Sequence, residues 1–460
     1  MNLRYLAIFS ERARSVGAKL LRCTLGMVIG FSLFAFSANA ETKVYVVKDN
    51  PNAAEPYNTW ETAAATVKTA TIFATNLVAT AALEGQDITV EVLVGKGEYN
   101  NDNNIYLCAG VTLRGATGNR DDVIIGQSSY TSATTKRIVV ATGAGAVIAD
   151  LTITGGYVYA HAGDSKYAYG GGVYLTQGAM ITNCHITACT GHYGGQAAGL
   201  YVSSSYAYDT LVDKCVTKPY KSASPIPTYG YAVYVTGNSV VDRCQIVDNK
   251  ATGTKYDTNR TGGALCIYNS AASSTIVRNS LIARNSATYQ RSGKNVWMGS
   301  GVSIRYGTLE NCTIVSNKAV DVSANTTGSA AGVVVRKDQG TVRNCHIAEN
   351  YDVSADVSVL KNYGVSDANE NGLDQFEYCC TSPLHAKFVS CVLDDKTKWT
   401  FDKRGRVKLL KGSPCIDAAS QQSWMVGATD LYGRDRKLYG KADIGAVEYV
   451  KPMGFNVIVR

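Results

Sequence analysis

Proline, histidine and charged residues are scarce in this chain. Its 460 residues include 8 Pro and 5 His, and only 18% are charged, whereas Gly (44) and Tyr (29) are abundant. So little charge argues against a disordered chain or an acidic tail. The net charge of +8 is mildly basic and no nucleic-acid-binding motif accompanies it, so we expect no nucleic-acid partner. A chain of this length can bury a large core.

Long apolar runs are absent from the sequence except near the N-terminus. Within residues 1–40, a segment with several Arg and Lys precedes the short apolar run 24–37, and Ala38-Asn39-Ala40 follows it. This order is typical of a secretory signal peptide, and the apolar run is short for a membrane span. We therefore expect a cleaved signal, a mature chain without a membrane span, and a secreted location: extracellular, at the cell surface or in the periplasm.

A short phrase recurs six times in the middle of the chain, with copies 27 to 37 residues apart. Each copy has apolar-x-apolar and then, about six residues later, apolar-x-x-Cys-x-apolar. The period of two indicates strands, and the regular spacing indicates stacked units. We predict an all-β fold, a right-handed parallel β-helix (a solenoid) with roughly three strands per turn. One column that should point inward is Val173, Leu200, Val233, Leu265, Val302 and Val333.

The residue before each Cys of the repeat is Asn or Asp in most copies. These residues tolerate the left-handed conformation that a sharp corner needs, and stacked Asn side chains can hydrogen-bond one another. Lys214 and Arg243 interrupt the series, so we expect local distortion at these two positions. The series is Asp150, Asn183, Lys214, Arg243, Asn279, Asn311 and Asn344.

Cysteine is plentiful, with 13 residues, of which only Cys23 falls in the expected signal. Five occupy one inward column, where parallel Cβ vectors disfavour disulfides, so we expect buried unpaired thiols there. Four others are better disulfide candidates. No usual zinc-ligand spacing occurs, the histidines are scattered, and no Cys/His arrangement stands out. The column is Cys184, Cys215, Cys244, Cys312 and Cys345, and the disulfide candidates are Cys379, Cys380, Cys391 and Cys415.

The repeats are flanked by two different segments. Residues 41–86 contain a strand and an Ala-rich stretch, 59–82, that we expect to be a helical cap, since the first turn of a solenoid otherwise exposes its core. Residues 87–400 should form the turns of the β-helix. Residues 401–460 lose the repeat and should form a small C-terminal capping module.

Three ordered motifs mark that module: residues 410–418 (LKGSPCIDA), 430–434 (DLYGR) and 443–449 (DIGAVEY). With them, the chain resembles secreted bacterial right-handed parallel β-helix proteins of the pectate-lyase-like superfamily, and residues 401–460 resemble the choice-of-anchor type Q module. The Trp60 segment and the turn 95–99 also fit. The resemblance implies a fold and export but no single activity, because such scaffolds carry lyases, hydrolases, isomerases and adhesins.

The charged residues of the module are interpreted as structural. We expect them to form a buried network of ion pairs and turns that closes the last turn of the solenoid. They are Asp417, Asp430, Arg434, Asp443 and Glu448.

The outward positions of the first strand of each repeat line up in two lanes, with neighbours about 5 Å apart. Lane 1 carries three Tyr, which would form an aromatic platform, and lane 2 ends with two Arg, which would bind carboxylate or sulfate groups. We therefore predict that an extracellular acidic polysaccharide binds the Tyr and Arg residues of this face; alternatively, they are ordinary outward strand residues. Lane 1 is Tyr174, Tyr201, Tyr234, Cys266, Ser303 and Val334, and lane 2 is Thr176, Ser203, Thr236, Tyr268, Arg305 and Arg336.

Catalysis on the same face is the alternative function. Hydrolysis of a glycosidic bond needs two carboxylates, and neither lane contains Asp or Glu. β-Elimination of a uronic acid needs a base and a cation beside the carboxylate. Tyr268 would serve as that base and Arg305 and Arg336 as the cations, which would make the protein a polysaccharide lyase. The segments between the repeats are also rich in Tyr. They leave a third alternative, an adhesin for host protein.

A calcium-loop pattern after the last regular repeat is incomplete. Asp367, Asn369 and Asn371 match its first ligand positions, but Tyr378 stands where a bidentate acid is required. We interpret this segment as an Asx-rich turn, and calcium is the only cofactor that the sequence leaves open.

Overall fold

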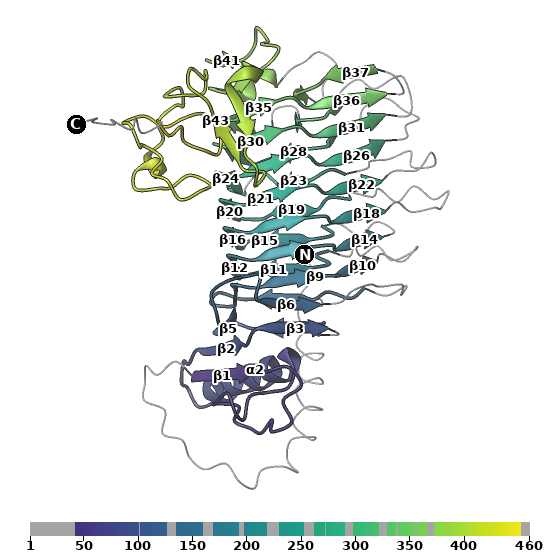
Figure 1. Cartoon of the computed structure of the whole chain (residues 1–460), viewed down its shortest axis with the longest axis vertical. Coiled ribbons are helices and arrows are strands. Elements are labelled where there is room, and N and C mark those ends of the chain that lie inside the picture. Colours follow the sequence, from purple (N-terminus) through teal and green to yellow (C-terminus); the bar gives the residue numbers. More distant parts are fainter. Residues whose placement is uncertain are drawn as a thin grey trace, which may run out of the picture. The chain divides into compact units, whose positions relative to one another are not determined.

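The computed structural model describes most of the chain from residue 42 onward (Figure 1). The predicted signal peptide, residues 1–40, lies outside the described residues. No helix among the described residues is long and apolar enough to cross a membrane. The described ranges are 42–100, 102–126, 135–159, 169–192, 197–218, 230–252, 262–271, 273–289, 298–321, 329–336, 339–354, 357–365 and 372–451.

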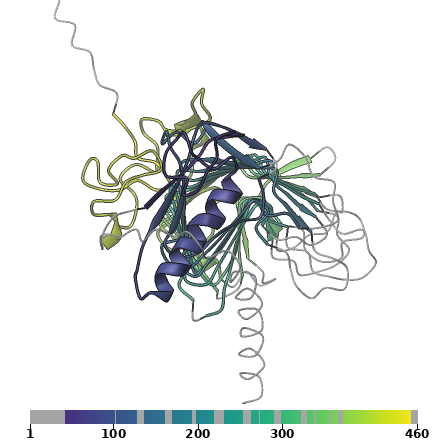
Figure 2. The same ribbon diagram turned by 90° about the horizontal axis from the view of Figure 1, so that it is seen from below.

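A parallel β-solenoid forms the body of the chain, as the repeat predicts (Figures 1 and 2). Within the described ranges, four long sheets, here named A to D, run along its axis. Their strands are parallel, apart from the antiparallel pair β36–β37 at the end of sheet D. The sequence predicted about three strands per turn, but the middle turns have four, because a short strand of sheet D precedes each return to sheet C.

The strands of each sheet come from successive turns. Sheet A contains β1 (Thr42–Val46), β2 (Val90–Val94), β5 (Val111–Gly115), β8 (Val147–Ala149), β12 (Met180–Thr182), β16 (Tyr206–Tyr208), β20 (Val240–Asp242), β24 (Ile276–Arg278), β29 (Thr308–Glu310), β34 (Thr341–Arg343) and β39 (Phe376–Glu377). Sheet B contains β3 (Gly97–Asn100), β6 (Val123–Gly126), β9 (Thr152–Thr154), β13 (His185–Thr187), β17 (Leu211–Asp213), β21 (Gln245–Val247), β25 (Leu281–Ala283), β30 (Thr313–Val315), β35 (His346–Ala348), β40 (Cys380–Thr381) and β41 (Val392–Leu393).

The other two long sheets are built in the same way. Sheet C contains β4 (Ile105–Leu107), β7 (Val139–Thr142), β11 (Val173–Thr176), β15 (Leu200–Ser203), β19 (Val233–Thr236), β23 (Leu265–Tyr268), β28 (Val302–Arg305), β33 (Val333–Val335) and β38 (Tyr363–Val365). Sheet D contains β10 (Tyr157–Tyr159), β14 (Thr190–His192), β18 (Val216–Lys218), β22 (Lys250–Thr252), β26 (Ser286–Tyr289), β31 (Lys318–Asp321), β36 (Tyr351–Ser354) and β37 (Val357–Leu360). Two short pairs are β27 (Met298–Gly299) with β32 (Ser329–Ala330), and β42 (Trp399–Phe401) with β43 (Val407–Leu409).

The apolar column of the repeat points into the solenoid. Val173, Leu200 and Val233 are register partners on neighbouring strands of sheet C, and each is at most 1% exposed. Leu265 and Val302 continue the column at 0% exposure. The period-two pattern therefore identified both the strands and their buried face.

Two corners flank sheet B, and both are built by residues in the left-handed conformation. At the A–B corner, Arg243 has a φ of 52°, like Asn279 at 50°, and its guanidinium pairs with Asp209 of the turn before at 2.8 Å. The predicted distortion at Arg243 is thus wrong. The ion pair takes the place of the hydrogen bond between stacked Asn side chains that was expected at this corner. Lys214, with a φ of 51°, belongs to the other corner, after β17. Asp209 is the A–B corner residue of that turn.

One cysteine of the predicted column also belongs to the second corner. In the A–B corner column the position after Asp209 is Thr210, and Cys215 lies at the second corner, where its N–H donates to Asn249 Oδ1 at 2.9 Å. Cys379 and Cys391, expected outside the column, continue it after the left-handed residues Tyr378 and Ser390. The expected disulfides are wrong for the described residues, where the cysteines are free thiols: Cys108, Cys184, Cys189, Cys215, Cys244, Cys266, Cys312, Cys345, Cys379, Cys380, Cys391 and Cys415.

A continuous asparagine ladder lines the second corner. The Nδ2 group of each member donates to Oδ1 of the next at 2.9 to 3.0 Å. The side chains are buried, so these hydrogen bonds satisfy amides that would otherwise be orphaned inside the core. The ladder ties successive turns together along the axis; its members are Asn249, Asn285, Asn317, Asn350 and Asn362.

One helix, α2 (Val67–Leu83), covers the N-terminal end of the stack (Figure 2). It is shorter than the predicted 59–82, because Thr66 caps it by accepting a hydrogen bond from the Thr69 N–H, and the preceding residues pair with β1 instead. The buried carboxylate of Asp102 also accepts from the Val67 N–H at 2.9 Å. Val67 and Ala70 pack into the main core.

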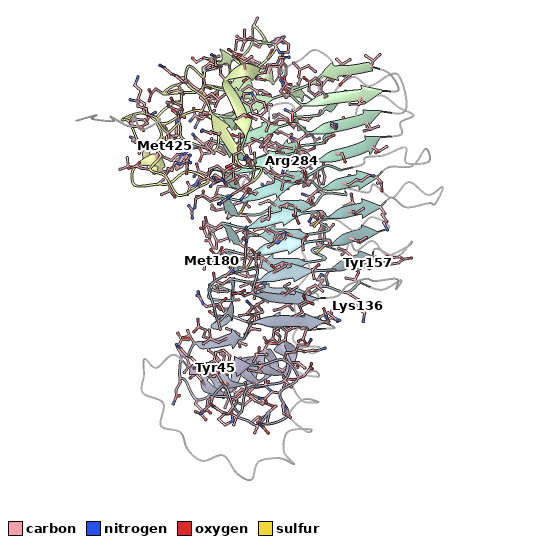
Figure 3. The ribbon with its side chains drawn as sticks, viewed as in Figure 1. Tyr45, Lys136, Tyr157, Met180, Arg284 and Met425 are labelled. Atoms are coloured by element: carbon pink, nitrogen blue, oxygen red, sulfur yellow. The ribbon has the colours of Figure 1, made fainter. Side chains whose placement is uncertain are left out.

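The C-terminal module packs on the outer face of sheet B. Trp399, Leu409 and Met425 share one apolar cluster with Leu281 and Ala348 of the solenoid. Figure 3 labels Met425 in this module and Arg284 at the corner below it, where the Arg284 guanidinium lies 5.0 Å from the ring centroid of Phe401. Three short 3-10 helices are described as well: η1 (Leu373–Gln375) precedes β39 of the solenoid, η2 (Lys396–Lys398) precedes β42, and η3 (Ser423–Met425) lies in the module.

The predicted charged network is present, with one member that the sequence did not suggest. Asp430 accepts from the Tyr432 and Arg434 N–H groups at 2.8 Å, as expected of a turn residue. The central cation is Arg436, which is 0% exposed and donates to Glu448 at 2.6 Å. Burial raises the pKa of Glu448 to about 8 and that of Asp443 to about 6, although Arg436 opposes both increases.

Candidate functional site

Lane 1 lies on the outward face of sheet C in the predicted register. Tyr174 pairs with Tyr201, and Tyr201 pairs with Tyr234. Their rings stack on one another along the axis, with centroids 4.9 Å apart at 12° and 5.9 Å apart at 23°. A sugar chain on this lane would therefore meet ring edges and hydroxyl groups, because neighbouring rings cover one another's faces.

A small second core covers part of lane 1. Tyr234 is only 7% exposed, and Cys266 and Ser303 are fully buried. Tyr231 lies against them and its hydroxyl group contacts Ser303 Oγ at 2.9 Å. Tyr234 is thus unavailable to a ligand in this conformation, contrary to the sequence-based expectation, because the short sheet-D strands and the returning segments pack over it. The other members of this core include Ala197, Ala251, Ala287, Ala319 and Ala331.

The tyrosine stack crosses into lane 2 and ends at an arginine. The ring of Tyr268 lies 6.2 Å from that of Tyr234. Arg305, its register partner, places its guanidinium carbon 4.6 Å from the Tyr268 ring centroid and donates a hydrogen bond to the Tyr268 hydroxyl group. The guanidinium also lies 5.8 Å from the Tyr306 ring. Cation–π contacts with these two rings hold Arg305 against the sheet.

Arg336 stands one turn further along lane 2. Its backbone N–H donates to the Ile304 carbonyl at 2.9 Å, so Arg305 and Arg336 follow each other on adjacent turns. Both side chains are partly exposed. Within the described ranges neither forms a salt bridge, and the Arg305 Nε atom is buried without a hydrogen-bond partner. The pair therefore presents positive charge at one end of the lanes.

Arg137 marks the other end of the stack, and the sequence analysis missed it. Its guanidinium lies 5.0 Å from the Tyr174 ring centroid, and its Nε donates to the Tyr169 carbonyl at 2.7 Å. Burial lowers the pKa of Arg137, while Tyr174 and Tyr106 counter that effect. Arg137 precedes its strand and stands outside the period-two pattern, so only its place on an early turn connects it to the lanes. A cavity of about 270 Å³ opens beside Tyr106, which is 61% exposed, and helix α2.

The lane side chains that are not fully buried offer cations, phenols and hydroxyl groups, since the Cys266 thiol is fully buried. Lane 1 and lane 2 carry no carboxylate, so they hold no acid pair for glycoside hydrolysis. Arg305 and the Tyr268 hydroxyl group are in direct contact, which places a cation beside a phenol oxygen able to accept a proton once ionised. This contact joins two of the predicted catalytic candidates, and Arg336 follows one turn away.

Metal-ligating side chains gather elsewhere. Among the described residues, His346, Cys380 and Cys415 bring their ligand atoms within 4.8 Å of one another, under the C-terminal module. The calcium candidates Asp367, Asn369 and Asn371 lie outside the described residues.

Comparison with known proteins gives matches to two solved structures. No family model matches the chain, and no curated protein matches it significantly. A crystal structure of pectate lyase Pel9A is 13% identical, with 89% of this chain and 97% of that chain covered, at a TM-score of 0.43. A crystal structure of Escherichia coli YbhC is 14% identical, covering 75% of this chain and 79% of that chain, at a TM-score of 0.28.

Proposed function

We propose that this protein binds an acidic polysaccharide along the outward face of sheet C. The observation that carries the proposal is the pairing of Arg305 and Arg336 on adjacent turns, partly exposed and without a carboxylate partner in the described residues. Parallel strands repeat at about 4.8 Å, which is close to the rise per sugar of an extended polymer. Successive acidic groups of one chain would then meet successive guanidinium groups.

Arg305 is partly exposed, and a ligand carboxylate or sulfate would pair with its positive charge. Its Nε atom is buried and takes no part in this contact. The tyrosine stack supports the site differently: Tyr268 holds the guanidinium in place, and the partly exposed Tyr174 and Tyr201 offer hydroxyl groups to the sugar. Stacking of sugar on flat ring faces has no part in it, because those faces are covered.

Binding of a fluorescently labelled polyuronate to the mature chain tests the proposal. We expect Arg305→Ala/Arg336→Ala to bind at least about tenfold more weakly, since charge-assisted hydrogen bonds contribute about 1.5–3 kcal/mol each. Binding by the wild type should also weaken as salt is raised, because partly exposed charges are screened. Lys403→Ala/Arg404→Ala, an exposed pair in the C-terminal module, is the matched control with the same loss of charge. Equal affinity of the two double variants would refute the proposal.

A polysaccharide lyase is the second candidate, and the contact between Tyr268 and Arg305 is the observation that favours it. In this role Tyr268 would remove the proton next to a uronic carboxylate while Arg305 and Arg336 neutralise that carboxylate. Release of unsaturated uronic products, followed by their ultraviolet absorbance, tests the activity with and without calcium. Tyr268→Phe should abolish product formation and retain binding, whereas a flat trace with the wild type would leave binding alone.

The proposal also covers export and the type of the C-terminal module, and both rest on the sequence. The order of basic, apolar and small residues in 1–40 favours export, so the polymer would be extracellular, at the cell surface or in the periplasm. The three motifs of residues 401–460 favour a module of the choice-of-anchor type Q kind at the C-terminal end of the solenoid. Detection of the mature N-terminus in culture medium or in a membrane fraction would test the first point.

A further inference from the structure

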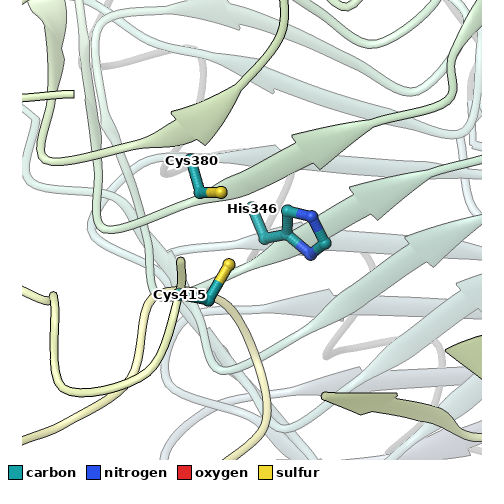
Figure 4. Close-up of side chains that lie close together, drawn as sticks. All are labelled: His346, Cys380 and Cys415. Atoms are coloured by element: carbon teal, nitrogen blue, oxygen red, sulfur yellow. The ribbon is translucent and has the colours of Figure 1, made fainter. Parts of the chain in front are cut away.

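Three metal-ligating side chains converge between the solenoid and the C-terminal module (Figure 4). His346 of β35 and Cys380 of β40 are register partners on adjacent strands of sheet B. Both share the module-facing side, and Cys415 of the module lies against Cys380 in the same cluster. One imidazole and two thiols, from two adjacent turns of the solenoid and from the module, therefore lie within 4.8 Å of one another.

One nitrogen of the imidazole has a hydrogen-bond partner and the other has none among the described residues. Its Nε2 atom lies 2.8 Å from Asp394 Oδ1, so the tautomer that donates from Nε2 leaves a lone pair on Nδ1. The Nδ1 atom is buried without a hydrogen-bond partner in the described part of the chain. A carboxylate that fixes one nitrogen of a histidine while the other binds a metal is the usual outer-shell arrangement of metal sites.

The surroundings suit a closed site. His346 is 1% exposed, and Cys380 and Cys415 are 0% exposed. The Trp399 ring packs edge-on against His346, with centroids 5.3 Å apart. Asp394 Oδ1 also accepts a weak hydrogen bond from the Cys380 thiol at 3.8 Å. Zinc prefers sulfur and nitrogen donors, and three protein donors leave its fourth tetrahedral position to a water molecule.

We propose that His346, Cys380 and Cys415 bind a thiophilic metal ion, for which zinc is the probe, and that this ion fastens the C-terminal module to the solenoid. Donor atoms around one zinc ion stand roughly 3.5–4 Å apart, so the three side chains need only a small closing movement. On binding, each thiol releases its proton to solvent, while the imidazole stays neutral and keeps its Nε2 proton on Asp394.

A disulfide between Cys380 and Cys415 is the competing use of these thiols. It would cross-link the module but leave the buried Nδ1 of His346 without a partner, whereas a metal ion satisfies all three groups. The orphaned nitrogen therefore favours the metal site. This inference is independent of the polysaccharide proposal, because no lane residue takes part in it.

The test uses the mature chain, purified in metal-free buffer with a reductant and then dialysed against zinc. We expect one zinc per chain by elemental mass spectrometry, a rise in Tm with zinc, and, with cobalt in place of zinc, the thiolate-to-metal charge-transfer absorption. Cys415→Ser and His346→Gln should each lose the bound metal and the rise in Tm. Cys312→Ser is the matched control, because it removes a buried thiol from a column where Ser280 occurs naturally.

Asp394→Asn tests the positioning role of the carboxylate. The variant keeps all three ligands, so it should still bind cobalt with thiolate absorption but with about 10- to 100-fold weaker affinity. The proposal is overturned if the wild type binds no zinc, if Cys415→Ser binds as much as the wild type, or if peptide mapping of protein isolated without reductant shows Cys380 linked to Cys415. The cobalt spectrum of the wild type keeps the test valid if a variant does not fold.

Discussion

The buried guanidinium of Arg436 donates to the Glu448 carboxyl group across 2.6 Å, with the two side chains 0% and 3% exposed. Arg436 also donates to Asn279 Oδ1 at 2.9 Å, and Asn279 is a corner residue of the solenoid. This pair therefore joins the C-terminal module to the stack through fully desolvated polar groups, next to the apolar cluster that the two share.

Removal of the acceptor should be costly. Glu448→Leu leaves the Arg436 cation buried without its partner, and arginine cannot escape by losing a proton. We expect a loss of about 3–5 kcal/mol in the free energy of unfolding, measured by urea titration at pH 9, where the Glu448 carboxyl group, with its pKa of about 8, is ionised. Arg436→Met/Glu448→Leu should recover a large part of that loss, because no charge is left unpaired. If the double variant were no more stable than Glu448→Leu, the unpaired cation would not be the cause.

The same carboxyl group should make stability depend on pH. Burial raises the pKa of Glu448 from 4.5 to about 8, so the folded state holds a proton that the unfolded state releases above its ordinary pKa. The free energy of unfolding should therefore fall as the pH rises from about 4.5 to about 8, and the buried Asp443 acts in the same direction up to about 6. Glu448→Gln cannot ionise, so its Tm relative to the wild type should increase over this range; a constant difference from pH 5 to pH 8 would contradict the assignment.

The asparagine ladder offers a test of the solenoid itself. Asn317→Ala removes an acceptor from Asn285 and a donor to Asn350, all of them buried. We expect a loss of about 1–3 kcal/mol in unfolding free energy, because buried amide groups lose their partners. Asn52→Ala, at an exposed turn, should change stability by less than about 0.5 kcal/mol. Similar effects of the two substitutions would show that the ladder does not stabilise the corner.

The corner thiols should resist modification. Burial raises the pKa of Cys184 and of Cys244 to about 12, so neither forms a thiolate at pH 8. A maleimide added to the native protein should label the partly exposed Cys108 and spare Cys184 and Cys244, as read by peptide mass spectrometry. The denatured protein serves as the control, in which every thiol reacts. Rapid labelling of Cys244 in the native state would mean that the solenoid opens locally.

The asparagine ladder was not predicted, although the sequence contains a pattern for it. The ladder positions Asn249, Asn285, Asn317 and Asn350 each follow a left-handed corner residue and recur at the spacing of the repeat. The prediction used the Cys pattern instead, which is weaker and marks the first corner. Two corners with nearly the same pattern in each turn explain why Cys215 was assigned to the wrong one.

The period-two pattern predicted only part of the candidate site. Alternation identified the outward residues of sheet C and put Tyr268, Arg305 and Arg336 in one lane, and the structure confirms that register. It did not show that Tyr234 is covered, because the covering alanines come from the short strands of sheet D and from segments that carry no repeat of their own.

The sequence by itself determined the parallel solenoid, the buried columns and the order of the lanes, because parallel stacking brings residues one repeat apart into contact. Only the tertiary structure decided what the C-terminal module contacts. Arg436 meets Glu448 and Asn279, and His346 meets Cys380 and Cys415, through docking of the module on sheet B. Such contacts join residues without a fixed spacing along the chain, so no period in the sequence predicts them.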